Sequence, residues 1–143
     1  MKVNKRLPSL AAIKRAVAQN PSRNRYKEDP LFRVKQIART RISCAIKNKG
    51  YSKHGKTIEI LGCSFEELKR HLEQRFTKGM TWANYGKHGW HVDHIVPISA
   101  ASTPEELEPL LHYMNLQPLW AKENISKSAD MPKVFQLHLC LPS

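Results

Sequence analysis

The sequence has no long hydrophobic run and only three cysteines, and both shortages exclude classes of protein. No apolar stretch approaches the roughly 20 residues that a membrane-spanning helix requires. The first 20 residues lack the apolar core and cleavage site of a signal peptide, so we expect a cytoplasmic protein. Cys44, Cys63 and Cys140 lie far apart and form no Cys-x-x-Cys pair. Neither a disulfide framework nor a structural zinc ion is therefore expected.

Acidic residues are scarce in the first 56 residues of the chain. Glu28 and Asp29 stand there against 16 lysines and arginines, a net charge of +14, whereas the rest of the chain carries a net charge of −2. A positive segment of this size is typical of a protein that binds a polyanion. Its basic residues are not set against a strong apolar face, which argues against a membrane surface. We therefore expect a nucleic acid as the partner, and the alternative is a solvated basic face without a specific ligand.

Two helices are predicted within this basic segment. Ser9 is a suitable N-cap for the first, and residues 21–27 after it are predicted to form a linker. Asp29 and Pro30 signal the start of a longer helix that stops at Gly50. Apolar residues recur along it at helical spacing, which leaves a basic face for phosphates. The basic side chains assigned to nucleic-acid contact are Arg33, Lys35, Arg39, Arg41 and Lys47.

The rest of the sequence alternates strand and helix signals. A strand is predicted over residues 57–61, followed by a helix that begins with a capping box at Ser64. A loop rich in glycine and aromatic residues comes next, in which we expect Trp82, Tyr85 and Trp90 to pack together rather than stack on bases. The later predicted elements are a strand over 91–98, a helix from Thr103, a strand over 115–120, a helix over 122–130 and a tail with strand character over 133–143. The pattern predicts the α+β class, with a basic helical extension over residues 1–56 and a second domain over residues 57–143.

Two adjacent residues of the predicted strand suit the hydrolysis of a phosphodiester bond. That reaction needs a base to activate water and a divalent cation to neutralise the phosphate. His94 suits the base role because an unperturbed imidazole has a pKa of about 6.5. Asp93 supplies a carboxylate, which suits a hard cation such as Mg²⁺. Adjacent side chains face opposite sides of an ideal strand, so both serve one site only if the strand twists or ends there.

Three later side chains complete a candidate site. Asn115 starts a predicted strand, from which it could hold the His94 imidazole through a hydrogen bond. Asn124 starts the last helix, where its oxygen could reach the same ion as Asp93, and Lys127 one turn further could neutralise a phosphate oxygen. Taken singly, each residue has a structural alternative, since asparagine is common in turns and helix caps.

The strings WHVDHIVPIS and NLQPLWAKENISKS resemble the HNH endonucleases of the His-Me finger, or ββα-metal, group. The likeness is to phage-encoded and intron-encoded homing-type members, whose motif runs D-H-I-x-P, then N-L-Q-P-L, then N-x-x-K. The preceding ILGCSFEELKRHLEQRFTKGMTWANYG is similar to a segment found before the motif in phage proteins of this kind. The resemblance covers about residues 58–128. It implies a ββα-metal core over residues 90–130, with a helical insertion, in a bacterial or phage-infected cell.

The resemblance also implies a role for each residue of the candidate site. His94 matches the general base, and Asn115 matches the residue that orients it. Asp93 and Asn124 match the ligands of one divalent metal, for which we expect Mg²⁺ or else Mn²⁺. Lys127 matches the last residue of the motif and is assigned to a phosphate contact.

The chain departs from the family pattern in three places. Many members have histidine where this chain has Asn124, so the motif here is H-N-N and a tightly held transition metal is less expected. The cysteine pairs that bind zinc in many members are missing. A glutamate-rich helix fills a long gap between His94 and Asn115. None of these departures removes a residue that the proposed chemistry requires.

Other residues compete for places in or near the site. His91 lies on the Asp93 side of an ideal strand and is assigned to phosphate or DNA contact, with a structural or supporting role as the alternative. His88 is a second candidate for DNA contact. Glu123 is the competing metal ligand if the helix register differs by one residue. The remaining histidines are interpreted as surface or packing residues: His54, His71, His112 and His138.

Three functions remain open from the sequence. The first is a metal-dependent endonuclease that binds double-stranded DNA, nicking as a monomer and cutting both strands as a homodimer. The second is a nucleic-acid-binding protein without catalysis, in which the motif is only a scaffold. The third is a nuclease that depends on a partner in a phage DNA-packaging complex.

Overall fold

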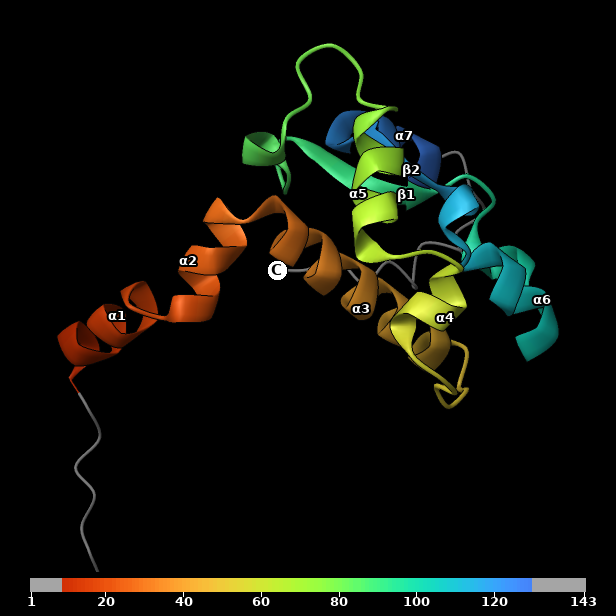
Figure 1. Ribbon diagram of the computed structural model, residues 1–143, viewed down its shortest axis with the longest axis horizontal. Coiled ribbons are helices and arrows are strands. Elements are labelled where there is room, and N and C mark those ends of the chain that lie inside the picture. Colours follow the sequence, from red (N-terminus) through yellow and green to blue (C-terminus); the bar gives the residue numbers. More distant parts are fainter. Residues whose placement is uncertain (1–8, 130–143) are drawn as a thin grey trace, which may run out of the picture.

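The computed structural model describes residues 9–129 and has the α+β class (Figure 1). It joins helices and short 3-10 turns to one two-stranded antiparallel sheet. No helix in this part of the chain is long and apolar enough to cross a membrane. The predicted strand character of residues 133–143 lies outside the described residues. The main elements are α1 (Leu10–Ala18), α2 (Pro21–Glu28), α3 (Pro30–Asn48), α4 (Thr57–Leu61), α5 (Phe65–Glu73), β1 (Trp90–His94), α6 (Pro104–Leu110), β2 (Leu116–Trp120) and α7 (Ala121–Ala129).

Local capping explains the first two helices. The Ser9 side chain accepts a hydrogen bond from the Ala12 N–H, which confirms the predicted start of α1. The predicted linker over residues 21–27 is wrong, because this segment forms α2. Asn20 caps α2 by accepting from the Ser22 N–H, and Pro21 occupies the first helical position, where its missing N–H costs nothing. The pair Asn20-Pro21 therefore starts α2 as well as following the end of α1.

The long helix α3 forms where the sequence predicts it. Asp29 accepts from the Phe32 N–H, and Pro30 follows the cap. One face of α3 is buried and packs against α4, α5 and the sheet. The buried apolar residues of this face are Val34, Ile37, Ala38, Ile42, Ala45 and Ile46.

Residues 57–61 form the short helix α4 instead of the predicted strand. Thr57 and Leu61 are both buried, and their spacing of four residues places them on one face of a helix. The Lys56 N–H donates to the Glu59 carboxylate over 2.6 Å, which satisfies a backbone group at the helix start. Gly62 ends α4 with a φ of 72°, and an added Cβ there would collide with the His112 ring.

The capping box predicted at Ser64 is confirmed. The Ser64 side chain accepts from the Glu67 N–H, and the Glu67 carboxylate accepts from the Ser64 N–H over 2.8 Å. The aromatic loop after α5 contains a 3-10 turn over Trp82–Asn84. Trp82, Trp90 and Tyr85 pack edge to face with ring centroids about 5 Å apart, which confirms the predicted packing cluster.

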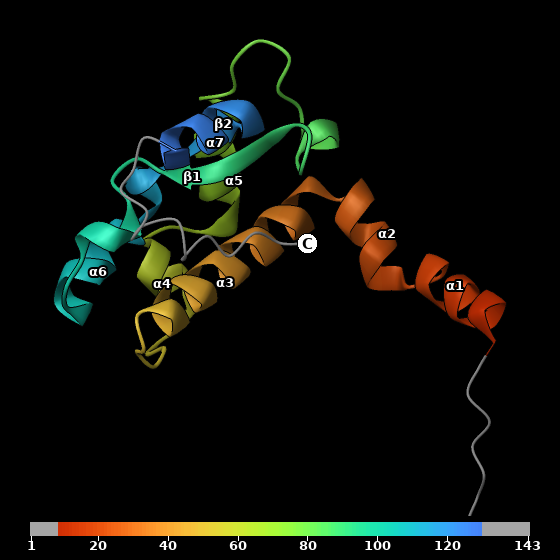
Figure 2. The same cartoon turned by 180° about the vertical axis from the view of Figure 1, so that it is seen from behind.

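The two strands form an antiparallel pair that leads directly into α7. Their register pairs Trp90 with Trp120 and Asp93 with Gln117. The helical insertion between the strands contains α6, whose N-cap Thr103 accepts from the Glu106 N–H. Because α7 begins immediately after β2 and contacts both strands, it covers one face of the sheet (Figure 2).

A single hydrophobic cluster spans the described residues on both sides of residue 56. Val34 and Ala38 of α3 share it with Leu68 of α5 and with Val92 and Leu116 of the sheet. Near the far end of α3, the Lys49 ammonium donates to the Ala101 carbonyl. The basic segment therefore includes a core helix, α3, as well as the exposed helices α1 and α2.

Candidate functional site

The carboxylate of Asp93 lies against α7. Its Oδ2 atom is 2.6 Å from the Lys127 ammonium, which also donates to the His94 carbonyl over 2.8 Å. Gln117, the cross-strand partner of Asp93, donates to the same Oδ2 over 3.3 Å. Asp93 is buried, so these contacts hold a negative charge at the interface between the sheet and the helix.

Asn124 lies on the same side of α7 as Lys127. The two residues are three positions apart, so they project from adjacent turns of one helix face. Asn124 is buried, which is unusual for an asparagine on a short helix that packs against a small sheet. Asp93 and Lys127 thus meet where α7 packs on the sheet, and Asn124 is a buried residue one turn before Lys127 on the same helix.

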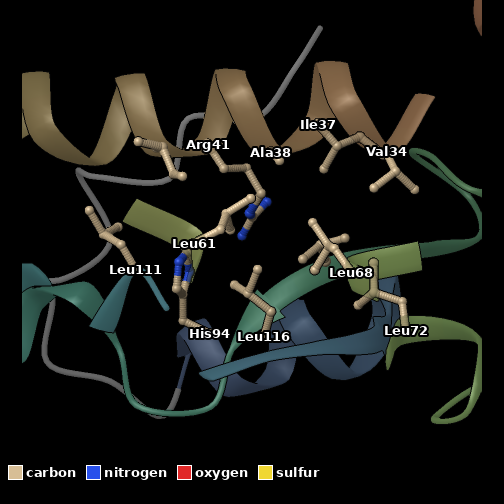
Figure 3. Close-up of a pocket in the computed structure, with 12 residues that line it drawn as sticks. Val34, Ile37, Ala38, Arg41, Leu61, Leu68, Leu72, His94, Leu111 and Leu116 are labelled. Carbon is tan, nitrogen blue, oxygen red and sulfur yellow. The ribbon is translucent and has the colours of Figure 1, made fainter. Parts of the chain in front are cut away.

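His94 lies in a small apolar pocket between the sheet and α3 (Figure 3). Leu61, Leu111 and Leu116 line this pocket, and the side chains of Arg41 and His94 both point into it. Burial lowers the pKa of His94 to about 3, and the positive charge of Arg41 acts in the same direction. The His94 imidazole is therefore neutral at ordinary pH, but a pKa this low makes it a weak proton acceptor while it lies in this pocket.

Asp93 and His94 use opposite sides of the strand. Asp93 contacts α7, whereas His94 points toward α3. The strand ends at His94, four residues before the predicted end at residue 98, and the chain does not bring the imidazole and the carboxylate together into one cluster. In the described conformation, His94 is separated from the interface that holds Asp93.

Asn115 does not hold the His94 imidazole, which corrects the prediction made from its position. Its Oδ1 accepts from the Val96 N–H over 2.8 Å, and its Nδ2 donates to the carbonyls of Val96 and Leu110. These three bonds use the donors and the acceptor of the amide. Asn115 instead fixes the backbone that follows His94, and it also accepts the Ile95 N–H through its own carbonyl.

His91 is half-buried beside Tyr85, with ring centroids 6.2 Å apart. Burial and the charge of Arg41 lower the pKa of His91. The Nδ1 atom of His91 is buried, and no residue in the described range gives it a hydrogen bond. The prediction that His91 contacts phosphate is untested, and its place beside Tyr85 also fits the structural alternative.

Arg33 is a structural residue, which corrects its assignment to nucleic-acid contact. It is buried, and its guanidinium donates to the carbonyls of Tyr26 and Lys27 over 2.7 Å and to that of Trp82. These bonds join the end of α2 to the aromatic loop. The helical pattern placed Arg33 off the apolar stripe, but it could not show that three carbonyls from outside α3 would converge on this side chain.

The other predicted basic contacts occupy different environments on α3. Lys35 and Arg39 lie over the Phe65 ring, at 5.8 Å and 5.6 Å from its centroid. Arg39 and Lys47 are exposed, whereas Arg41 points into the His94 pocket. Arg39 and Lys47 therefore remain available to a phosphate backbone in this conformation.

The oxygen donors at the sheet and helix interface fit a hard divalent cation. Asp93 offers a carboxylate and Asn124 an amide oxygen, and Mg²⁺ is commonly held by one or two protein groups with water and substrate phosphate. The Lys127 ammonium now occupies one oxygen of Asp93, so an ion would compete with it. Within residues 9–129, no group of three or more histidine, cysteine or acidic side chains is arranged to hold a metal.

Gln117 is a site residue that the sequence analysis missed. Its contact with Asp93 follows from the strand register, which pairs the two residues directly across the sheet. The string N-L-Q-P-L contained this glutamine, but its partner depends on how the two distant strands align. Because the insertion between the two strands is long, the sequence alone does not determine how the strands align.

Comparison with known proteins finds two similar viral proteins. The uncharacterized protein L426 of Acanthamoeba polyphaga mimivirus is 34% identical over 119 residues, which are 81% of this chain and 51% of that protein. The uncharacterized protein L246 of the same virus is 30% identical over 105 residues, 72% of this chain and 45% of that protein. The chain thus spans about half the length of the curated relatives it matches. No family model and no solved structure matches the chain.

Proposed function

We propose that the protein is a divalent-metal-dependent DNA endonuclease with a ββα-metal core formed by β1, β2 and α7. The observation that carries the proposal is the placement of Asp93 from β1 against Lys127, with Asn124 one turn away, at the interface of sheet and helix. These are the residues that the resemblance to the HNH endonucleases assigns to metal and phosphate. The basic charge of the first 56 residues supports DNA as the substrate.

Each residue of the site has a chemical task in this proposal. Asp93 and Asn124 would hold Mg²⁺ or Mn²⁺, which neutralises the developing negative charge on the scissile phosphate. Lys127 would leave Asp93 and bind a phosphate oxygen. Once exposed to solvent, which would reverse the lowering of its pKa by burial, His94 would accept the proton of the attacking water. The water oxygen would bond to phosphorus as the bond to the 3′ oxygen breaks, and the leaving 3′ oxygen would take up a proton from solvent.

Asn115 contributes by position and not by contact with the reacting groups. Its three side-chain bonds hold Val96 and Leu110, and so fix the chain immediately after His94. Loss of these hydrogen bonds would change the direction of the backbone that follows His94. Such a small displacement is costly in a site where the base must meet the water at hydrogen-bond distance.

The exposed helices α1 and α2 extend from the body of the protein (Figures 1 and 2). The basic residues of α2, with Arg39 and Lys47 of α3, would bind the DNA backbone, while α7 and the sheet would face the scissile phosphate. Binding through phosphates falls steeply as the salt concentration rises. One site hydrolyses one strand, so the expected product of a single encounter is a nick.

A nucleic-acid-binding protein without catalysis is the second candidate, and the burial of His94 favours it. The His94 side chain lies in an apolar pocket beside Arg41, on the opposite side of the strand from Asp93. If this arrangement persists on DNA, no base reaches the phosphate. DNA affinity would then be independent of His94 and of metal. The third candidate is a nuclease that cuts only together with a partner in a phage DNA-packaging complex.

A plasmid-nicking assay separates the two candidates. The full chain is incubated with supercoiled DNA and Mg²⁺ or Mn²⁺, with EDTA as the metal-free control. His94→Ala tests the base, and His54→Ala is its matched control because His54 is an exposed histidine between α3 and α4, outside the candidate site. DNA binding by each variant is measured in the same buffer.

Nicking that requires metal and is lost in His94→Ala, but retained in His54→Ala, would support the endonuclease. Equal binding by all variants without any nicking would overturn the proposal for the isolated chain and favour the non-catalytic protein. Nicking that appears only after a packaging protein is added would identify the partner-dependent alternative.

A further inference from the structure

The helix α1 carries an apolar face that no described part of the chain covers. Leu10, Ile13 and Val17 are 69%, 45% and 47% exposed, and their spacing places them on one side of the helix. Lys14 lies beside this apolar stripe. None of the α1 residues is buried in the described structure, although large apolar side chains are costly to leave in water. An exposed apolar face of this kind is typical of an amphipathic helix that docks into an apolar groove.

A matching groove lies at the other end of the molecule. It has a volume of about 700 Å³ and is bounded by α4, α6 and the segments next to β1 and β2. Ile95, Val96 and Met114 provide an apolar floor and remain exposed, Met114 by 55%. The carboxylates of Glu105 and Glu108 stand at its margin, together with Glu59 of α4.

The two surfaces are complementary in charge, and both carry exposed apolar side chains. A helix with an apolar stripe and a flanking lysine would place apolar side chains on the groove floor and positive charge beside the glutamates. This acidic margin is notable in a chain whose net charge is +12. We propose that α1 of one molecule docks into this groove of a second copy of the same chain.

The groove and α1 of one molecule are too far apart to meet. The connections from α1 to α2 and from α2 to α3 are short, and α3 has 19 residues, a length of about 28 Å. In Figure 1, α1 and α6 lie at opposite ends of the molecule. Two copies arranged in opposite directions can each donate α1 to the other, which gives a closed two-fold dimer with two identical contacts.

The dimer does not depend on the proposed nuclease function. It predicts self-association in the absence of DNA and metal. If the nuclease proposal also holds, the dimer carries two sites and can cut both strands of a duplex. Failure of the nicking assay would leave the dimer intact, and failure of the dimer would leave single-strand nicking intact.

The test measures the mass of the full chain by sedimentation over a range of concentrations. Ile13→Asp introduces a charge on the docking face of α1, and Ala11→Asp makes the same change in charge on the opposite face as the matched control. Met114→Asp changes the groove, and Ile125→Asp is its control because Ile125 is exposed on α7 outside the groove. All four positions are exposed, and circular dichroism verifies that each variant folds.

The proposal predicts a dimer for the unmodified chain and both controls, with dissociation constants raised at least about tenfold in Ile13→Asp and in Met114→Asp. Mixing these two variants should restore part of the association, because the mixed pair keeps one intact contact between a normal α1 and a normal groove. A monomer at all concentrations, or a dimer that Ile13→Asp leaves unchanged, would overturn the proposal. Loss of DNA binding in Ile13→Asp without any change in mass would also overturn it and assign α1 to DNA.

Discussion

The Lys127 ammonium lies 2.6 Å from the Asp93 carboxylate and also donates to the carbonyl of His94. One side chain of α7 thus joins two consecutive residues of β1. The positive charge of Lys127 therefore lies beside the Asp93 carboxylate, which the resemblance assigns to a metal. The lysine compensates the charge of Asp93, and in the proposed metal site an ion would have to displace it.

Replacing Lys127 by methionine should therefore destabilise the metal-free protein. The Asp93 side chain is only 10% exposed, so its charge would be left without its closest cation. We expect a loss of about 1–2 kcal/mol, reduced from the value for a fully buried pair because Lys127 is 30% exposed. Urea unfolding measures the loss, and Lys122→Met on the exposed side of α7 is the control.

The same variant separates a metal site from a simple ion pair. Without the competing ammonium, Mn²⁺ should raise the melting temperature of Lys127→Met more than that of the unmodified protein. The added Asp93→Asn change should remove this effect. If Mn²⁺ shifts neither protein, Asp93 and Asn124 do not form a metal site.

Asn115→Ala should cost stability as well as activity. The change removes three hydrogen bonds and leaves the Val96 and Leu110 backbone groups without these partners, a loss of about 2 kcal/mol. Thermal unfolding measures this loss, and a nicking assay measures the change in rate. A normal stability with a lower nicking rate would instead indicate direct contact of Asn115 with the base or the substrate.

Arg33 and Arg39 should respond differently to replacement by alanine. Arg33→Ala removes a buried guanidinium that binds three carbonyls, so we expect a loss of about 2–3 kcal/mol in urea unfolding. Arg39→Ala should change stability by less than about 1 kcal/mol, but weaken DNA binding and reduce its salt dependence. Equal effects of both changes on stability would contradict the assignment of Arg33 to structure.

Protonation of His71 should weaken the fold in mild acid. Burial lowers the pKa of His71, whose Nε2 lies 2.8 Å from the Leu116 carbonyl oxygen. The unfolded chain therefore binds the proton more readily, and the stability that the neutral ring provides is present above about pH 6.5 and lost as the pH falls toward the lowered pKa. In His71→Gln, the free energy of unfolding should fall less steeply over this range. An unchanged slope would show that other groups account for it, His91 and His94 among them.

Local signals in the sequence predicted the elements that depend on neighbouring residues. The caps at Ser9, Asp29 and Ser64 are such cases, because a side chain and a backbone group a few positions away decide them. The errors arose where a local signal has two meanings. Asn20 ends one helix and caps the next, and the five residues 57–61 suit a strand or a helix until their burial is known.

Only one contact of the candidate site follows from the order of the elements. A hairpin followed directly by a helix brings Asp93 and Lys127 together. The burial of His94 under α3 depends on how a helix from the first third of the chain packs against the sheet. The bonds of Asn115 depend on the conformation of the insertion. No pattern of residues at a fixed spacing in the sequence predicts the burial of His94 or the hydrogen bonds of Asn115.

The rate at which the full chain nicks supercoiled DNA, compared between the unmodified protein and Asp93→Asn in Mg²⁺ or Mn²⁺, tests the central claim most directly. The substitution preserves the shape of the side chain and removes its charge. The account predicts metal-dependent nicking that falls by at least about a hundredfold in Asp93→Asn, with DNA binding retained. Equal nicking by the two proteins, or none by either while both bind DNA, would contradict a metal-dependent site at Asp93.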